Sequence, residues 1–574
     1  MRLALAVVLA AAPALAGTGA VPAKTPTRSR AIPAAAPAPH GDASGEIKPR
    51  LDGAHARVAF GQAGVLRPAR EVVGRREEPL TPEEATAKQI ESLLRGPLRY
   101  SVTGVFVADA RTGEPLFAVN ADDPLNPASN VKMISTATAL ELLGPDFRYP
   151  TRLLGPEPDD LGTIRGNVYL LGSWDPTLAA SDLDDIAAQL AARGVRELDG
   201  DVVVGRDPTR DAIYRATLPI EIRAGAPGEP PIATPPAGFD LVTFKIAATT
   251  ARTVRRAALG YAAETITDPA GHLRVQLSIT GTLGKGATLV YPLEVAERTA
   301  FAGHALRAAL RAHQIAITGD VKLEELGDFI GDAVQSGALP IELGRHESAP
   351  LAEIIAHVNK WSINWLADRI VMTAAGLAHR QPPSMALAVE AMYGWLARHV
   401  HLDKADLLVD TGSGLSYQTR ITAHELVSIV RCAAGYVPDS DPAVARAWLG
   451  SLSIGGTDGT LGRRFRAPEV RGRLFGKTGT LSTVIALSGV LEVDPARPLA
   501  FSIVTNGDRP LAKGYVRKAH EQLIGLITKY LATTAKSSIA PAPTRTTPAE
   551  RAPEDLDEAE TPDPQLDAET AGDK

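Results

Sequence analysis

The residues best placed to do chemistry are a serine and a lysine in the stretch PASNVKMIST, residues 127–136. Ser129 and Lys132 form an S-x-x-K, and positions i and i+3 of a helix share one face, so the amine can reach the hydroxyl. The run that follows, to Leu143, is apolar on all sides, which predicts a buried helix. Burial lowers the pKa of a lysine, so Lys132 is suited to act as the base that activates Ser129. Alone, the motif is a weak signal, because chains of this length contain it by chance.

A second candidate is Lys477-Thr478-Gly479-Thr480, in the middle of a predicted strand. Gly479 would let a ligand backbone approach the strand closely. Lys477 offers a charge for a carboxylate, and Thr478 offers a hydroxyl donor. An ordinary turn with an exposed lysine is the alternative, and the mid-strand position argues against it.

A third candidate is Ser362-Ile363-Asn364, where a tight turn could present a hydroxyl relay and an amide donor together. Such a tripeptide is common, so its weight comes from its order in the chain. It lies 233 residues after Ser129 and 115 before Lys477.

S-x-x-K, then S-x-N, then K-T-G on a strand is similar to the constellation of the penicilloyl serine transferases. With its long interval between the first two motifs, the chain resembles the low-molecular-mass class C penicillin-binding proteins. These are D-alanyl-D-alanine carboxypeptidases and endopeptidases, and they have a large insertion between those two motifs. Further segments like that family are GSWDPTL, TGSGLS, GGTDGTLGRRF and GKTGTLSTVIALSG. The resemblance covers about residues 85–532.

The resemblance implies that the serine attacks the carbonyl between two D-alanines of a peptidoglycan stem peptide, or a D-amino-acid cross-link. It implies β-lactams as acylating partners, an oxyanion hole from the N–H groups of Ser129 and Thr480, and no metal or cofactor. Lys477 and Thr478 would hold the substrate carboxylate, and Asn364 the substrate amide. The implied catalytic residues are Ser129, Lys132, Ser362, Asn364 and Lys477, and the implied substrate-binding residues are Thr478, Gly479 and Thr480.

The chain departs from the family pattern at three positions. Ile363 replaces an aspartate, and Thr411 and Tyr417 replace the ends of D-G-S-G-L-S-R. The loss of the arginine, where Tyr417 stands, puts in doubt how a substrate side-chain carboxylate is anchored. A serine β-lactamase or esterase and a non-catalytic cell-wall-binding protein are the alternatives. The first lacks support because there is no E-x-x-L-N loop, and the second would be expected to lose Ser129 or Lys132.

Composition describes a soluble globular protein, with 45% hydrophobic and 22% charged residues. The net charge of −6 and the lack of a basic patch with interleaved aromatics argue against nucleic-acid binding. Cys432 is the single cysteine, so no internal disulfide can form, and its apolar neighbours predict a buried filler.

The predicted fold class is α/β and multidomain: a transpeptidase-like (serine β-lactamase-like) domain, with an antiparallel sheet flanked by helices, interrupted by a large inserted α+β module. A capped helix from 81, a hairpin over 103–120, three sequential strands over 473–507 and a closing helix over 518–531 belong to the catalytic domain. The start of the chain predicts a cleaved signal, hence a periplasmic or otherwise exported protein with no stable membrane anchor. The predicted parts are 1–16 signal, 17–80 Pro/Ala-rich leader, 81–150 with 345–532 catalytic domain, 151–344 insertion and 533–574 acidic tail.

Overall fold

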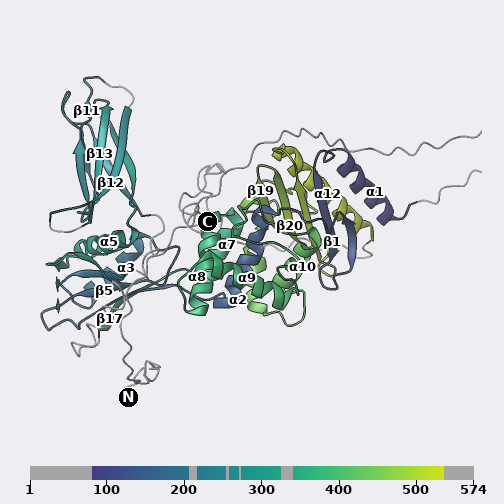
Figure 1. Cartoon of the computed structure of the whole chain (residues 1–574), viewed down its shortest axis with the longest axis horizontal. Coiled ribbons are helices and arrows are strands. Elements are labelled where there is room, and N and C mark those ends of the chain that lie inside the picture. The colour runs from purple at the N-terminus through teal and green to yellow at the C-terminus, as the bar shows by residue number, and fades with distance from the viewer. Residues whose placement is uncertain (1–79, 206–215, 254–257, 270–272, 325–339, 535–574) are drawn as a thin grey trace, which may run out of the picture. The chain divides into compact units, whose positions relative to one another are not determined.

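The computed structural model describes residues 80–205, 216–253, 258–269, 273–324 and 340–534 (Figure 1). The expected signal, the expected leader up to residue 79 and the expected tail from residue 535 lie outside these residues. The described elements form two groups with separate hydrophobic cores. The core residues of one group lie between 90 and 149 and between 351 and 531, and those of the other between 153 and 343. The mixed α/β class is confirmed.

A six-stranded antiparallel sheet forms the centre of the first group, in the order β18-β19-β20-β21-β1-β2. The predicted hairpin and the predicted run of three sequential strands are both present, and β1 joins them by pairing with β21. β20 is buried along its whole length, in agreement with its largely apolar sequence. The strands are β18 (Ser453–Ile454), β19 (Leu474–Leu481), β20 (Val484–Leu491), β21 (Leu499–Asn506), β1 (Val102–Asp109) and β2 (Pro115–Val119).

Helices cover both faces of this sheet (Figure 1). On one face lie α1 (Pro82–Arg95), which begins at a capping box of Thr81 and Glu84, and α12 (Lys513–Thr534), which begins earlier than predicted. The remaining helices of this group and two short 3₁₀ helices lie on the other face of the sheet or at the edge of the sheet. They are η1 (Ala128–Val131), α2 (Lys132–Leu143), α7 (Leu351–Trp361), α8 (Asn364–His379), α9 (Met385–His399), α10 (Ala423–Ala433), α11 (Pro442–Ser451) and η3 (Gly459–Leu461).

The second group contains short strands and helices, as the sequence predicts for the insertion. One sheet has the order β16-β7-β5-β3-β17 and a second the order β15-β6-β4; a third has the order β14-β8-β9, and in the fourth β10, β11 and β12 all pair with β13. Its described strands are β3 (Pro150–Gly155), β4 (Thr163–Arg165), β5 (Val168–Leu171), β6 (Glu197–Asp199), β7 (Val202–Gly205), β8 (Thr217–Arg223), β9 (Ile232–Thr234), β10 (Val242–Ile246), β11 (Thr249–Thr250), β12 (Ala258–Thr267), β13 (Leu273–Leu283), β14 (Thr288–Glu294), β15 (Ala316–Ile317), β16 (Val321–Glu324) and β17 (Ile341–Glu347). Its described helices are η2 (Ala180–Asp182), α3 (Leu183–Ala192) and α5 (Arg298–Ala312).

The two ends of the insertion lie side by side. Pro150 of β3 pairs with Glu347 of β17, so the insertion's last strand continues beyond the expected boundary at 344. Just outside this pair, the Tyr149 N–H donates to Ser348 Oγ at 2.9 Å, and the Ser348 N–H donates to the Tyr149 carbonyl at 3.1 Å. The chain therefore leaves and re-enters the first group at one place. None of the described helices has the length and apolar character that a membrane span requires.

Candidate active site

Ser129 and Lys132 meet where η1 passes into α2. Ser129 lies in the 3₁₀ turn, in which side chains at i and i+3 eclipse, and Lys132 is the first residue of the α-helix. Lys132 Nζ lies 3.0 Å from Ser129 Oγ. The lysine is completely buried and the serine nearly so, and the predicted buried helix is confirmed over Lys132–Leu140.

Two further hydrogen bonds orient the Lys132 amine. Nζ donates to Asn364 Oδ1 at 2.6 Å and to the Ser413 carbonyl at 2.7 Å. The carbonyl can only accept, and so can the amide oxygen, so both bonds must use N–H groups of the lysine. A neutral amine has two such groups, so in that form its lone pair can face Ser129. This geometry suits proton transfer from the serine hydroxyl to the amine.

Asp368 is a residue of this site that sequence reasoning missed. It lies on α8, one turn after Asn364, and its Oδ1 accepts from the N–H of Ser413 at 2.7 Å. The same residue, Ser413, gives its carbonyl to Lys132. Burial raises the pKa of Asp368, and the nearby Lys132 charge opposes that rise. The available signal was the i,i+4 spacing from Asn364 in SINWLAD, which places both residues on one helix face.

Ser362 and Lys477 form a second serine–lysine pair. Ser362 ends α7 in the left-handed region, at φ 57°, and its Oγ accepts from Lys477 Nζ at 2.8 Å. Lys477 is completely buried in β19 and also donates to the Thr478 carbonyl at 2.9 Å. The sequence predicts that Ser362 and Asn364 work together from one turn. The structure instead directs Ser362 to Lys477 and Asn364 to Lys132.

Gly479 lies against the chain that leads to Ser129. A Cβ on this glycine would lie 2.4 Å from the Pro127 carbonyl oxygen, so the missing side chain makes room for that chain. Gly414 holds the next peptide in the same way, since its Cβ would lie 2.2 Å from the Ala128 oxygen. Ala128 itself adopts φ 47°, a strained conformation for a residue with a side chain. Two glycines from distant motifs thus position the backbone before Ser129.

The two threonines of the K-T-G-T segment have separate partners. Thr478 Oγ1 donates to Thr460 Oγ1 at 2.9 Å, and Thr480 Oγ1 accepts from Arg517 Nη2 at 3.1 Å. Thr460 follows Asp458, whose carboxylate pairs with Lys360 Nζ at 2.6 Å at the end of α7. The G-T-D-G-T-L segment, which includes η3, therefore connects Thr478 to the end of α7.

Cys432 lies outside the site. It is half-buried rather than buried as predicted, packs against the core of the first group, and its Sγ lies 3.1 Å from the His399 carbonyl. Burial raises the pKa of its thiol to about 11, which suppresses the reactive thiolate. Across the described ranges, no group of three or more His, Cys, Asp or Glu side chains could hold a metal ion.

Comparisons with known proteins give matches over most of this chain. The model of the D-Ala-D-Ala carboxypeptidase 3 (S13) family matches residues 86–209 and 208–530. A D-alanyl-D-alanine carboxypeptidase of Actinomadura sp. (strain R39) is 33% identical over 73% of this chain and 80% of its own, and a carboxypeptidase of Mycobacterium tuberculosis is 29% identical over 70% and 76%. The crystal structure of penicillin-binding protein 4 from Haemophilus influenzae in complex with a β-lactam has a similar fold. Its TM-score is 0.56 and its identity 20%, over 77% of this chain and 99% of that one.

Proposed function

The chain belongs to the D-Ala-D-Ala carboxypeptidase 3 (S13) family, and from that premise we propose that it cleaves the terminal D-alanyl-D-alanine bond of peptidoglycan stem peptides through an acyl-enzyme on Ser129. It is a serine-type D-Ala-D-Ala carboxypeptidase and a low-molecular-mass class C penicillin-binding protein. The observation that carries the proposed mechanism is the Lys132 amine, held by Asn364 and Ser413 and facing Ser129 Oγ at 3.0 Å.

In the acylation step, neutral Lys132 takes the hydroxyl proton while Ser129 Oγ bonds to the scissile carbonyl carbon. Negative charge then develops on the carbonyl oxygen. We assign the N–H groups of Ser129 and Thr480 to stabilise it, each donor contributing about 10²–10³ in rate. The edge of β19 beyond Lys477 supports this assignment, because β18 pairs only with Phe475 and Gly476. An extended peptide can therefore lie along the rest of the edge.

The Ser362–Lys477 pair serves the leaving group. An ammonium only donates, so Ser362 Oγ accepts from Lys477 and keeps its own hydrogen for another acceptor. Ser362 can pass that proton to the departing D-alanine nitrogen as the C–N bond breaks, and the proton that Lys132 took from Ser129 replaces it, so Lys132 is neutral again before deacylation. Water then attacks the acyl carbon, Lys132 again takes the proton, and Ser129 is released. The same steps cleave a D-amino-acid cross-link, which makes endopeptidase activity part of the proposal.

β-Lactams are the proposed inhibitors, because their strained amide presents the same carbonyl and carboxylate to Ser129. After ring opening, the amine stays attached to the acyl group and deacylation is slow. We also propose that the protein is exported, since the start of the sequence has the features of a signal segment and peptidoglycan lies outside the cytoplasm. A processed N-terminus at Gly17 in cell fractions supports export, and an unprocessed cytoplasmic protein refutes it.

The function is tested with purified protein, a fluorescent penicillin and a D-Ala-D-Ala pentapeptide. Covalent labelling and release of one D-alanine are expected, and Ser129→Ala should lose both. Cys432→Ser is the matched control, because it removes the single thiol and should label normally. Labelling that persists in Ser129→Ala refutes the assignment of the nucleophile. A wild-type protein that neither labels nor releases D-alanine favours a non-catalytic wall-binding role.

A further inference from the structure

β20 contains a single polar side chain, Ser488, which is completely buried. Its register partners are Lys477 on β19 and Ser502 on β21, and both of these are also completely buried. Directly paired residues of antiparallel strands present their side chains on the same face of the sheet. Ser488 therefore lies on the face from which Lys477 reaches Ser362. Because a buried hydroxyl is costly unless it is hydrogen-bonded, the partners of Ser488 indicate its role.

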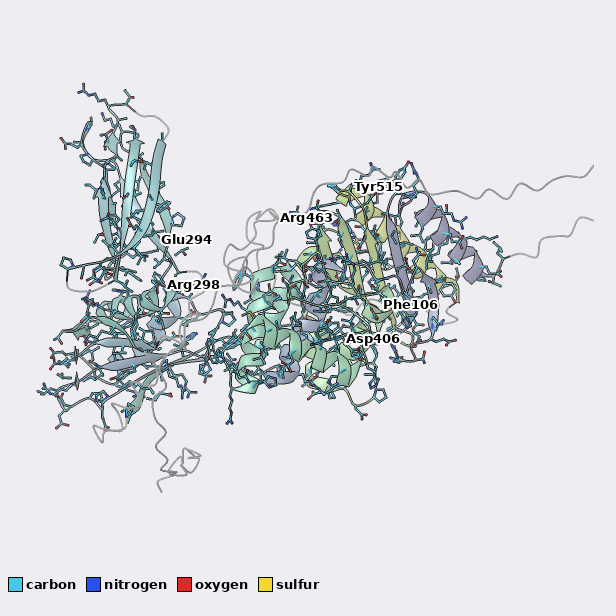
Figure 2. The ribbon with its side chains drawn as sticks, viewed as in Figure 1. Phe106, Glu294, Arg298, Asp406, Arg463 and Tyr515 are labelled. Atoms are coloured by element: carbon cyan, nitrogen blue, oxygen red, sulfur yellow. The ribbon has the colours of Figure 1, made fainter. Side chains whose placement is uncertain are left out.

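The partner of Ser488 from outside the sheet is Asn130, the residue that follows the nucleophile. Asn130 Nδ2 donates to Ser488 Oγ at 2.7 Å, and Ser488 Oγ lies 2.9 Å from Ser502 Oγ. Asn130 is completely buried, and side chains fill the space between this sheet and its helices (Figure 2). Asn130 and Ser488 are 358 residues apart in the chain, so their bond joins the turn of the nucleophile directly to the middle of the sheet.

The amide oxygen of Asn130 shows that this pair is not optimised for stability. Among the residues that the structure describes, Asn130 Oδ1 is buried without a hydrogen-bond partner. A buried acceptor without a donor retains the cost of its desolvation, whereas apolar side chains of the same shape at both positions would avoid that cost. Stability alone therefore does not explain why an asparagine and a serine occupy these positions.

The bond acts on the position of Ser129. Ala128, the residue before the nucleophile, packs against the apolar side chains where β19 turns into β20. Asn130, the residue after it, bonds to Ser488. Contacts on both sides of Ser129 thus hold η1 on the sheet, and the one at Ser488 is beside Lys477 in the strand register. The nucleophile and the lysine of the second serine–lysine pair are therefore held by adjacent strands.

We propose that Asn130 and Ser488 are positioning residues, whose bond keeps Ser129 aligned with the second serine–lysine pair during acyl transfer. This inference rests on the proposed acyl transfer at Ser129 and adds to it two residues that touch neither the substrate nor the transferred proton. A small displacement of a nucleophile slows a reaction strongly, because the reacting atoms must be aligned before the bond forms. The pair should therefore affect the rate of the chemical step more than the binding of the substrate or the pH dependence.

The test replaces the acceptor of the bond. With a D-Ala-D-Ala pentapeptide, Ser488→Ala should lower kcat about 10-fold and change KM by less than about twofold. The rate of fluorescent penicillin labelling should fall by a similar factor, and the midpoints of its pH profile should not move, because no titrating group is changed.

Thr103→Val is the matched control for the loss of a buried hydroxyl from the same sheet. Thr103 lies on β1, the strand that Phe106 marks in Figure 2, and its Oγ1 lies 3.0 Å from Thr505 Oγ1. This variant should lower the Tm about as much as Ser488→Ala does and keep kcat and KM within about twofold of the wild type.

A double variant tests whether Asn130 and Ser488 act as one unit. Asn130→Ala and Ser488→Ala break the same bond, so the double variant should be no slower than the slower single variant. Multiplied losses in the double variant would show that the two residues act separately, which overturns the inference.

Three other results overturn it. A kcat of Ser488→Ala within about twofold of the wild type removes the positioning role. Equal losses of kcat in Ser488→Ala and Thr103→Val, with equal losses of Tm, assign the bond to stability alone. A displaced pH profile in Ser488→Ala assigns the pair to proton transfer instead. A wild-type protein that neither labels nor cleaves the peptide is a different result, because the acyl-transfer proposal then fails and this inference fails with it.

Discussion

Asp368 links the loop that contains Ser413 to the catalytic amine, and replacing it with asparagine tests that link. The carboxylate accepts from the Ser413 N–H at 2.7 Å, and the Ser413 carbonyl accepts from Lys132 at 2.7 Å. Asparagine keeps the shape and an oxygen acceptor but removes the charge. Ser413, whose carbonyl holds Lys132, therefore exchanges a hydrogen bond to a charged carboxylate for a weaker one to a neutral amide. The side-chain volume is unchanged.

The expected effect follows from the hydrogen-bond energies. A bond to a charged group contributes roughly 1.5–3 kcal/mol and a neutral one roughly 0.5–1.5 kcal/mol. The difference, about 1 to 1.5 kcal/mol, corresponds to roughly a 5- to 12-fold slower acylation if it is felt in the transition state. Stability should move the other way. Because burial raises the folded pKa of Asp368, its stabilising contribution is present at low pH and lost as pH rises through that pKa, so at pH 7 the variant should melt no lower than the wild type.

The assay is the rate of fluorescent penicillin labelling as a function of pH, with the Tm measured in parallel. Loss of a negative charge near Lys132 should also move the acidic limb of the labelling rate to lower pH, because the ammonium is less stabilised. Asp410→Asn is the control, since Asp410 anchors the same loop through the hydroxyls of Ser416 and Thr419. A labelling rate within twofold of wild type with a superimposable pH profile would refute the reasoning. Equal slowing in both variants, with lower Tm, would reduce Asp368 to a general loop anchor.

Three other predictions test different parts of the structure. Gly479→Ala should abolish labelling, because the new Cβ would lie 2.4 Å from the Pro127 oxygen, and normal labelling of this variant would contradict the packing argument. Gly525→Ala on α12 is the control: its Cβ meets open space, and the variant should raise the free energy of unfolding by about 0.5–1 kcal/mol. Asp175 is fully buried, and burial raises its pKa to about 6. Asp175→Asn should therefore increase the free energy of unfolding, measured by chemical denaturation, by about 2–3 kcal/mol at pH 8 and leave it unchanged near pH 4. A difference that does not depend on pH would contradict the titration of Asp175. At pH 8, Cys432 should react with an aromatic disulfide reagent about 100-fold more slowly in the folded protein than after denaturation, and equal rates would show an exposed thiolate.

The parts of the fold that the sequence predicts are those with strong local patterns. The capping box at Thr81 and the apolar run after Lys132 define helices without help from distant residues. The three strands from Leu474 to Asn506 are close in sequence, so their antiparallel pairing follows from short turns. The S-x-x-K spacing predicts the Ser129–Lys132 pair, whereas the pairing of Ser362 with Lys477 is visible only in the fold.

The residues that sequence reasoning missed act through long-range placement. Asp368 reads as a polar residue within a helix, and only the fold shows that it faces Ser413, 45 residues later in the chain. For Gly479, strand periodicity does not reveal that the Pro127 backbone lies against it. Pro127 lies against that glycine because η1 packs on β19.

The insertion explains how a site can be assembled from residues so far apart in the chain. Ser129 and Ser362 are 233 residues apart, yet the insertion between them closes on itself through the Pro150–Glu347 pair and has its own core. The entropy of closing a loop grows only with the logarithm of its length, about 0.6 kcal/mol per doubling, so a self-folding insertion adds little cost. At its base, the Tyr149 hydroxyl lies 2.8 Å from Thr373 Oγ1 on α8, the helix that begins at Asn364. The junction is therefore fixed to the helix that holds Lys132, and we expect changes within the insertion to leave the catalytic amine in place.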